Sequence, residues 1–178
     1  MWAVAAPLAG ALSVLAACTP PANPQAMVAV PQGTIGAMDP ALLRAVSVSA
    51  VSGVEGTDSL WMSELAATAF QDALNQSLAA QQLLADTPAA ARYALNAQIL
   101  EVSQPRVGFD MTAETRISYV LSDLATGQQP FAETISSEGT ASFGDDLNGD
   151  ERRRLATEAA VRSNIRQFLE RLASVRVP

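Results

Sequence analysis

Few residues of this sequence could do chemistry, and their types limit what that chemistry could be. The chain of 178 residues contains no His and no Lys, and all 11 of its basic residues are Arg. The lack of His removes the usual activation of a Ser or Cys nucleophile and a common metal ligand. The lack of Lys removes Schiff-base chemistry and the phosphate-binding P-loop. Any catalysis would depend on carboxylates, and the single cysteine, Cys18, is a candidate for modification.

Cys18 ends the sequence Leu15-Ala16-Ala17-Cys18, which follows an apolar run from Trp2 and precedes Thr19 and two prolines. This pattern looks like a bacterial lipobox, which predicts that residues 1–17 are a lipoprotein signal peptide and that Cys18 is acylated. One alternative is an ordinary secretory signal, which would leave an odd thiol in an oxidising compartment. The other is an uncleaved anchor, but the apolar run is shorter than the ~20 residues that span a bilayer. No basic residue precedes Arg44, whereas signal peptides normally begin with positive charge.

The formal net charge of −7 argues against nucleic acid as a partner and against attraction to anionic lipids. Membrane attachment would therefore come from the acyl chains on Cys18, each buried CH₂ of which contributes about 0.8 kcal/mol. Five prolines between Cys18 and Ala41 predict that residues 18–41 form a Pro-rich tether. Within the tether, the apolar patch from Met27 to Val30 could dock on the domain. Residues 42–178 are long enough for one domain with its own core.

The hydrophobic pattern of residues 42–178 predicts four strands and two helices. Apolar residues alternate with polar ones from Leu43 to Val51, from Tyr93 to Ile99, from Met111 to Ser122 and from Phe131 to Phe143, which is typical of strands buried on one face. Apolar residues recur at helical spacing from Leu60 to Leu84, and again from Asn148 or Asp150 to Ser174.

The order of these elements, β-α-β-β-β-α, predicts an α+β fold. Short connections between the last three strands favour an antiparallel meander, and the first strand would join it through a right-handed β-α-β crossover. Two amphipathic helices need one apolar sheet face to cover. We therefore expect a two-layer sandwich with a four-stranded, mostly antiparallel sheet and both long helices on one face.

Two charged clusters flank the start of the last predicted helix. Asp145, Asp146, Asn148 and Asp150 surround Gly149, but they do not match the spacing of an EF-hand, so we predict a helix-capping loop and no metal or cofactor. Arg152, Arg153 and Arg154 fall in the first turn, where the helix dipole disfavours cations. They are a possible anion-binding patch for phosphates of lipopolysaccharide (LPS) or lipid headgroups; the alternative is a solvated run of charge.

The predicted open sheet face carries Glu114, Arg116 and Glu138. Paired carboxylates could serve acid–base chemistry, but cross-strand pairing on a wetted face explains them better. The alternative to a binding protein is thus an enzyme with carboxylate-based chemistry, such as a hydrolase or acyltransferase, tethered in the periplasm. Trp61, at the start of the first predicted helix, could be a surface anchor, although covering the core is the simpler role.

The lipobox, the tether and the order of elements together resemble small Gram-negative envelope lipoproteins of the LPS-assembly and ABC-transport auxiliary types. The resemblance rests on architecture over most of the chain, and Cys18 is the one residue it assigns. It implies a non-enzymatic accessory subunit in LPS or lipid transport or in outer-membrane assembly, with a periplasmic location and an envelope protein, LPS or lipid as partner. Thr19 after the cysteine, in place of Asp, is similar to outer-membrane sorting signals.

Overall fold

The structure, a computed structural model, describes residues 22–31, 38–53, 64–103 and 108–177. Its centre is a four-stranded sheet in the order β1-β2-β3-β4. The strands are β1 (Val46–Ser52), β2 (Tyr93–Ser103), β3 (Met111–Asp123) and β4 (Phe131–Ala141). β1 pairs with β2 in parallel, whereas β2 with β3 and β3 with β4 are antiparallel. The predicted mostly antiparallel sheet is therefore confirmed.

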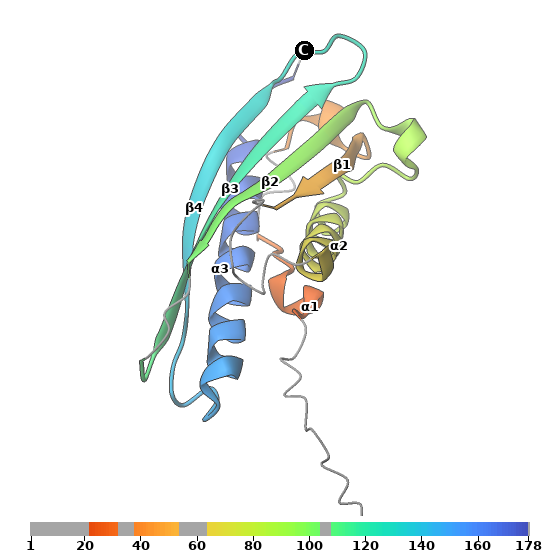
Figure 1. Ribbon diagram of the computed structural model, residues 1–178. Helices are drawn as coiled ribbons and strands as arrows, with labels where there is room; N and C mark the ends of the chain where they lie inside the picture. Colours follow the sequence, from red (N-terminus) through yellow and green to blue (C-terminus); the bar gives the residue numbers. More distant parts are fainter. Residues whose placement is uncertain (1–21, 32–37, 54–63, 104–107, 178) are drawn as a thin grey trace, which may run out of the picture.

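The helices lie together on one side of this sheet (Figure 1). Two are long, α2 (Glu64–Ala80) and α3 (Gly149–Leu172), and the short helix α1 (Pro24–Met27) lies against both of them. Single 3-10 turns occupy Pro40–Leu42 and Pro88–Ala90. This arrangement confirms the predicted α+β sandwich. Within the described segments, no helix combines the length and the apolar character needed to cross a membrane.

The alternation of side chains along the strands follows the prediction closely in β2 and β3. Buried, helix-facing positions are Tyr93, Leu95, Ala97 and Ile99 in β2, and Met111, Ala113, Thr115, Ile117, Tyr119 and Leu121 in β3. β1 departs from the expected pattern because its register against β2 shifts between Val48 and Ala50. The shift reverses the faces beyond that point, so that Ala50 is exposed and Val51 packs against the core instead.

The second helix ends earlier than predicted, at Ala80 rather than Leu84. Gln82 adopts a left-handed backbone conformation, with φ of 58°. The N–H of Gln82 donates to Ala79 O and the N–H of Leu83 donates to Leu78 O, both at 2.9 Å. These two bonds are a Schellman motif, which satisfies the last carbonyls of the helix. Leu84 then forms a β-bridge with Val46 of β1. The apolar residues after Ala80 therefore belong to a segment that pairs with the sheet and not to the helix.

The last strand also ends earlier than predicted, at Ala141, and Phe143 lies beyond it with 46% of its surface exposed. Asp145 accepts hydrogen bonds from the backbone N–H and the hydroxyl of Ser142, which starts a turn after the strand. Asn148 then caps α3 by accepting from the N–H of Asp150 at 2.9 Å. The predicted helix start at Asn148 is confirmed, and the strand and helix are joined by a structured loop.

α3 is held against β3 and β4 by an aromatic stack and a buried polar network. The rings of Tyr119 and Phe168 stack with centroids 4.3 Å apart. The Tyr119 hydroxyl donates to Asn164 Oδ1 at 3.0 Å, and Asn164 Nδ2 donates to Ile135 O and Ser137 Oγ. Because each buried polar group in this network has a partner, the network fixes the rotation and height of α3 on the sheet.

Candidate functional site

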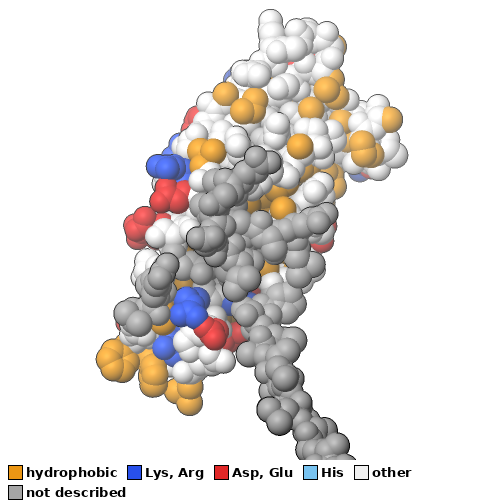
Figure 2. Space-filling view, in the orientation of Figure 1, with side chains coloured by type: hydrophobic (Ala, Val, Ile, Leu, Met, Phe, Trp, Pro, Cys, Tyr) orange, Lys and Arg blue, Asp and Glu red, His pale blue; other side chains and the backbone are white. Residues whose placement is uncertain are grey.

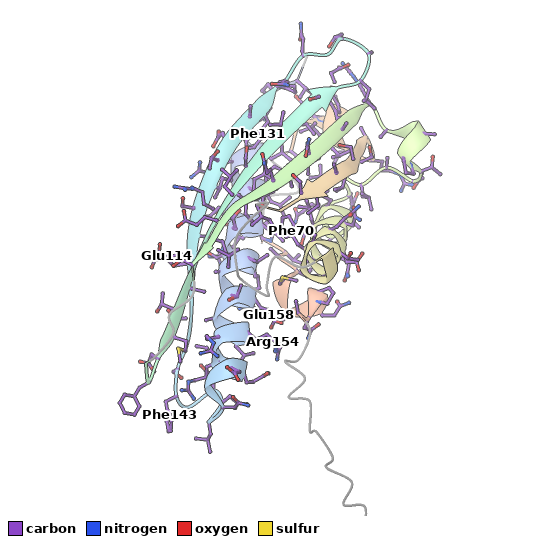
Figure 3. All side chains as sticks on the ribbon, viewed as in Figure 1. Phe70, Glu114, Phe131, Phe143, Arg154 and Glu158 are labelled. Carbon is purple, nitrogen blue, oxygen red and sulfur yellow. The ribbon has the colours of Figure 1, made fainter. Side chains whose placement is uncertain are left out.

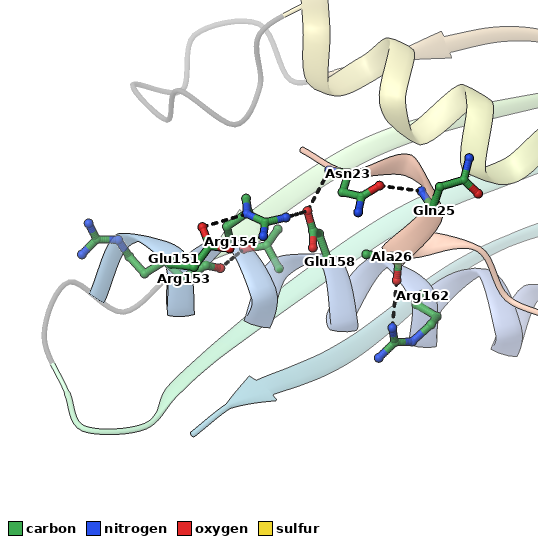
Figure 4. Close-up of polar contacts among 9 residues, drawn as sticks. Asn23, Gln25, Ala26, Glu151, Arg153, Arg154, Glu158 and Arg162 are labelled. Atoms are coloured by element: carbon green, nitrogen blue, oxygen red, sulfur yellow. Dashed lines mark hydrogen bonds and ion pairs between the residues drawn. The ribbon is translucent and has the colours of Figure 1, made fainter. Parts of the chain in front are cut away.

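The segment that the sequence predicts as a tether is, in its described part, folded into the groove between α2 and α3. The N–H of Ala29 donates to Ser77 Oγ at 3.0 Å, and Gln81 Nε2 donates to Pro31 O at 3.2 Å, which ties the segment to α2 and the turn after it. On the other side, the N–H of Asn23 donates to Glu158 Oε1 at 2.7 Å (Figure 4). We call residues 22–31 the docked segment.

The local sequence explains how a proline-rich stretch can dock in this way. Asn23 accepts from the N–H of Gln25 at 3.1 Å and so caps α1. Pro24 occupies the first turn, where a backbone N–H would have no partner within the helix, so proline is tolerated there. Met27 and Ala29 are almost fully buried in the main core, whereas Val30 is 58% exposed. Docking of the apolar patch is therefore confirmed for Met27 and Ala29 but not for Val30. The prolines that predicted a tether are compatible with it.

Glu158 is the charged centre of this groove. It is 1% exposed, and its Oε1 also accepts from Arg154 Nη1 at 2.5 Å. Its second oxygen, Oε2, is buried without a hydrogen-bond partner among the described residues. Arg162, one helical turn further on, donates to Ala26 O at 2.8 Å (Figure 4). This buried carboxylate accepts from two donors, one of them in the docked segment, and so ties that segment specifically to α3.

Arg154 is shared between Glu158 and Glu151. Its Nε lies 3.1 Å from Glu151 Oε2, and its Nη2 is bonded to Glu151 Oε1. The bonds from Arg154 lower the pKa of the Glu151 carboxyl, although partial burial opposes them. The same pairing, with Glu151 first and Glu158 also contributing, raises the pKa of Arg154. Glu151 and Arg154 are therefore held as an ion pair, and Arg154 contacts both carboxylates.

The three arginines of the predicted anion-binding patch do not come together on the surface. Arg152 is 5% exposed; its Nη1 donates to Asp146 O at 2.7 Å and its guanidinium lies over the Phe143 ring. Arg153 pairs with Asp150, and Arg154 pairs with Glu151 and Glu158. All three side chains bind groups of this chain, so anion binding stays a prediction that this arrangement does not favour.

Glu114, Arg116 and Glu138 do lie together on the open sheet face, as predicted. Glu114 and Glu138 are directly opposite each other in the β3–β4 register, and Arg116 pairs with Glu101 across β2–β3 at 2.7 Å. They border an open hollow of about 350 Å³, which we call the open-face hollow (Figure 3 labels Glu114). Glu101 and Ser136 also line it, and Thr115, Ser137 and Gln167 of α3 contribute from the side that the helices cover.

The acidic loop before α3 acts as the capping loop that was predicted. Asp145 binds Ser142, Asp146 Oδ1 accepts from the N–H of Asn148 at 2.7 Å, and Asn148 caps the helix. The bonds from the backbone N–H and the hydroxyl of Ser142 lower the pKa of the Asp145 carboxyl. Across the described part of the chain, no three acidic or cysteine side chains gather in a group that could hold a metal ion.

Cys18 and Trp61 lie outside the described residues, so their predicted roles stay predictions. Sequence reasoning did not identify Glu158 as the partner of the docked segment. The available signal was the position of Glu158 among Ala156, Thr157, Ala160 and Val161 on the apolar side of the helix. A carboxylate there is rarely left without a partner, yet its partner comes from residues 135 positions away.

Comparisons with known proteins establish the fold. No family model and no curated protein matches the chain. Among solved structures, one named a putative lipoprotein, from Caulobacter crescentus, has 17% identity and a TM-score of 0.51, over 80% of this chain and 93% of that chain. A protein from Xanthomonas campestris has 13% identity and a TM-score of 0.51, over 83% of this chain and 90% of that one. The sandwich is therefore a fold that other bacterial proteins share.

Proposed function

We propose that this protein is a non-enzymatic lipoprotein of the bacterial envelope, anchored through acylated Cys18, which acts by binding a partner. One observation carries the proposal. The lipobox ends five residues before Asn23, where the chain is bonded to buried Glu158 of α3. An acyl anchor at Cys18 would thus be coupled to the folded domain through a very short connection. The shared fold with a protein named a lipoprotein supports the same proposal.

The anchor is tested by expression in a bacterial host with labelled palmitate. Wild type should incorporate the label, and the mass of the mature N-terminal peptide should show diacylglycerol on Cys18. Cys18→Ser should lose the label and accumulate as the uncleaved precursor, whereas Ser13→Ala, in the same apolar run, should behave as wild type. Processing of Cys18→Ser at the same site would show an ordinary signal peptide and would overturn the anchor.

A more specific proposal concerns the accessory role of the protein and the membrane to which it is sorted. Resemblance to the LPS-assembly and ABC-transport auxiliary types supports an accessory role in LPS or lipid transport or in outer-membrane assembly. Thr19 supports outer-membrane sorting, so Thr19→Asp should move the protein to inner-membrane fractions on a density gradient. Affinity purification from detergent-solubilised envelopes should recover subunits of such a machine or bound lipid. Recovery of neither, from wild type that is correctly acylated, would exclude the accessory role.

The alternative enzymatic function has one supporting observation, the three carboxylates of the open-face hollow. A carboxylate-dependent hydrolase or acyltransferase should turn over ester or glycoside substrates and should lose that activity in Glu114→Gln and Glu138→Gln. Glu133→Gln, at an exposed position of β4 outside the hollow, is the matched control. The sequence favours binding over catalysis because neither His nor Lys is present to assist a carboxylate.

A further inference from the structure

Three large apolar side chains project into solvent at one end of the molecule. Phe109 is 81% exposed, Leu147 is 78% exposed and Phe143 is 46% exposed. Phe109 lies just before β3, and the other two lie in the loop between β4 and α3, so they come from two separate segments. Figure 2 shows hydrophobic side chains gathered at this end, and Figure 3 labels Phe143 there. We call these three residues the apolar tip.

Specific contacts hold the two phenylalanines of the apolar tip in place. The Phe109 and Phe143 rings meet edge to face with centroids 6.0 Å apart. The N–H of Phe143 donates to Asp110 Oδ1 at 3.1 Å, which ties the two segments together. Beneath them, buried Arg152 donates to Asp146 O and Gly108 O and lies over the Phe143 ring at 5.1 Å. A structure that fixes its phenylalanines outward in this way is typical of a surface with an apolar partner.

The anchor lies within reach of the same end. Asn23 is bonded to Glu158, nine residues along α3 from its start at Gly149, which is about 14 Å at 1.5 Å per residue. The five residues from Cys18 to Asn23 can span at most about 17 Å. A membrane that holds Cys18 is therefore close enough for the apolar tip to touch.

We propose that the apolar tip inserts into the interfacial layer of the bilayer that holds acylated Cys18, so that the domain stands on this tip. The inference rests on the proposed acylation. Insertion would be driven by apolar contact, since Asp110, Asp145 and Asp146 beside the tip give no attraction to anionic lipid. The turn after β3, with Leu124, would then point away from the membrane.

The test uses the full mature protein, in which the proposed acylation would turn the Cys18 sulfur into a thioether; the sequence has no other cysteine. Leu147→Cys provides a single thiol for an environment-sensitive dye, and Leu124→Cys, 59% exposed at the other end of the sheet, is the matched control. Both are reconstituted through their acyl chains into vesicles of phosphatidylethanolamine and phosphatidylglycerol. The dye at position 147 should shift to the blue and lose most of its emission to a nitroxide-labelled lipid, whereas the dye at 124 should do neither.

Equal responses at 147 and 124, in protein shown by mass to be acylated, would overturn the proposal while leaving the lipid anchor intact. Absence of acylation would instead overturn the proposed function on which the inference rests. A blue shift at 147 that depends on protein density and not on the quenching lipid would assign the tip to a second copy of the chain, which also overturns it. If Leu147→Cys does not fold, Phe109→Cys, which is equally exposed, takes its place.

Discussion

The backbone N–H of Asn23 and the side chain of Glu158 are joined by a 2.7 Å hydrogen bond across 135 residues of sequence. Glu158 is 1% exposed, so this bond is formed inside the protein, between the docked segment and α3. It brings a point five residues from the predicted acylation site into contact with the middle of α3. A force applied at Cys18 would therefore have only five residues of chain between it and the bond to α3.

Removal of the Glu158 carboxylate should release the docked segment. Glu158→Ala leaves Arg154 with Glu151 alone and leaves the Asn23 N–H unpaired, so we expect a loss of about 3 kcal/mol in the free energy of unfolding. Glu158→Gln keeps one acceptor oxygen and should lose less. Chemical denaturation measures the stability, and hydrogen exchange at Asn23 and Ala29 reports the docking.

Glu170→Gln is the control for this change, because Glu170 is an exposed residue of the same helix and its pair with Arg166 is 3.9 Å long. It should alter stability by at most about 0.5 kcal/mol. If Glu158→Ala lowers stability but leaves the exchange of Asn23 and Ala29 unchanged, Glu158 supports α3 only, and its role in holding the docked segment is wrong.

Gly139 of β4 marks the closest approach of the sheet to α3. A Cβ placed on Gly139 would lie 2.1 Å from the N of Ala160 and 2.5 Å from the O of Ala156, both backbone atoms that cannot rotate away. Gly139→Ala should therefore cost about 3 kcal/mol by forcing the helix off the sheet. Gly144→Ala, where the nearest atom is 3.7 Å away, should stay within about 0.5 kcal/mol. Equal thermal stabilities of the two variants would contradict this packing.

The strand register makes a simpler prediction. Ile117 is fully buried and Ser118 is partly exposed on the other face of β3. Ile117→Ala should cost roughly 2–5 kcal/mol through cavity formation, whereas Ser118→Ala should change stability by about 0.5 kcal/mol at most. Urea titration of both variants checks the register, which is wrong if the losses are alike.

Acid should destabilise the protein partly through Asp123, at the end of β3. Its side chain accepts from the N–H groups of Ala125 and Thr126 and pairs with Arg92. These bonds, those from the backbone first, hold the pKa of Asp123 below its ordinary value of 3.8. A carboxyl with a lowered folded pKa stabilises the folded state above pH ~4 and loses that contribution as the pH falls through the folded value.

Asp123→Asn keeps an oxygen for the turn but cannot titrate. We expect its stability, followed by thermal melting from pH 6 down to pH ~2, to fall less steeply below pH ~4 than that of wild type. Asp72→Asn, at an exposed position of α2, should keep the wild-type slope. Parallel curves for wild type and Asp123→Asn would show that this carboxyl does not determine the loss of thermal stability at low pH.

The strands were predictable because their signal is local. The period-2 pattern from Met111 to Leu121 identifies the buried face without knowledge of what covers it. The end of α2 was not predictable in this way, since a left-handed Gln82 gives no sequence signal comparable to glycine, and Leu83 and Leu84 continue the apolar pattern. The docked segment was hidden for another reason: its prolines are typical of a tether, and its partners Ser77 and Glu158 are distant in sequence.

The arginine run shows the same limit at the candidate site. Three adjacent cations at a helix start resemble an anion site on the basis of charge alone, but their partners are set by the helix and the loops around it.

Arg154→Gln should lower the free energy of unfolding by about 2–3 kcal/mol, because buried Glu158 would lose its counter-charge. Arg153→Gln should cost about 0.5 kcal/mol at most, since its partner Asp150 is 60% exposed. Denaturant titration of the two variants, with binding of LPS measured alongside, separates the roles. A triple Gln variant of Arg152, Arg153 and Arg154 that keeps its stability and loses LPS binding would restore the anion-binding patch.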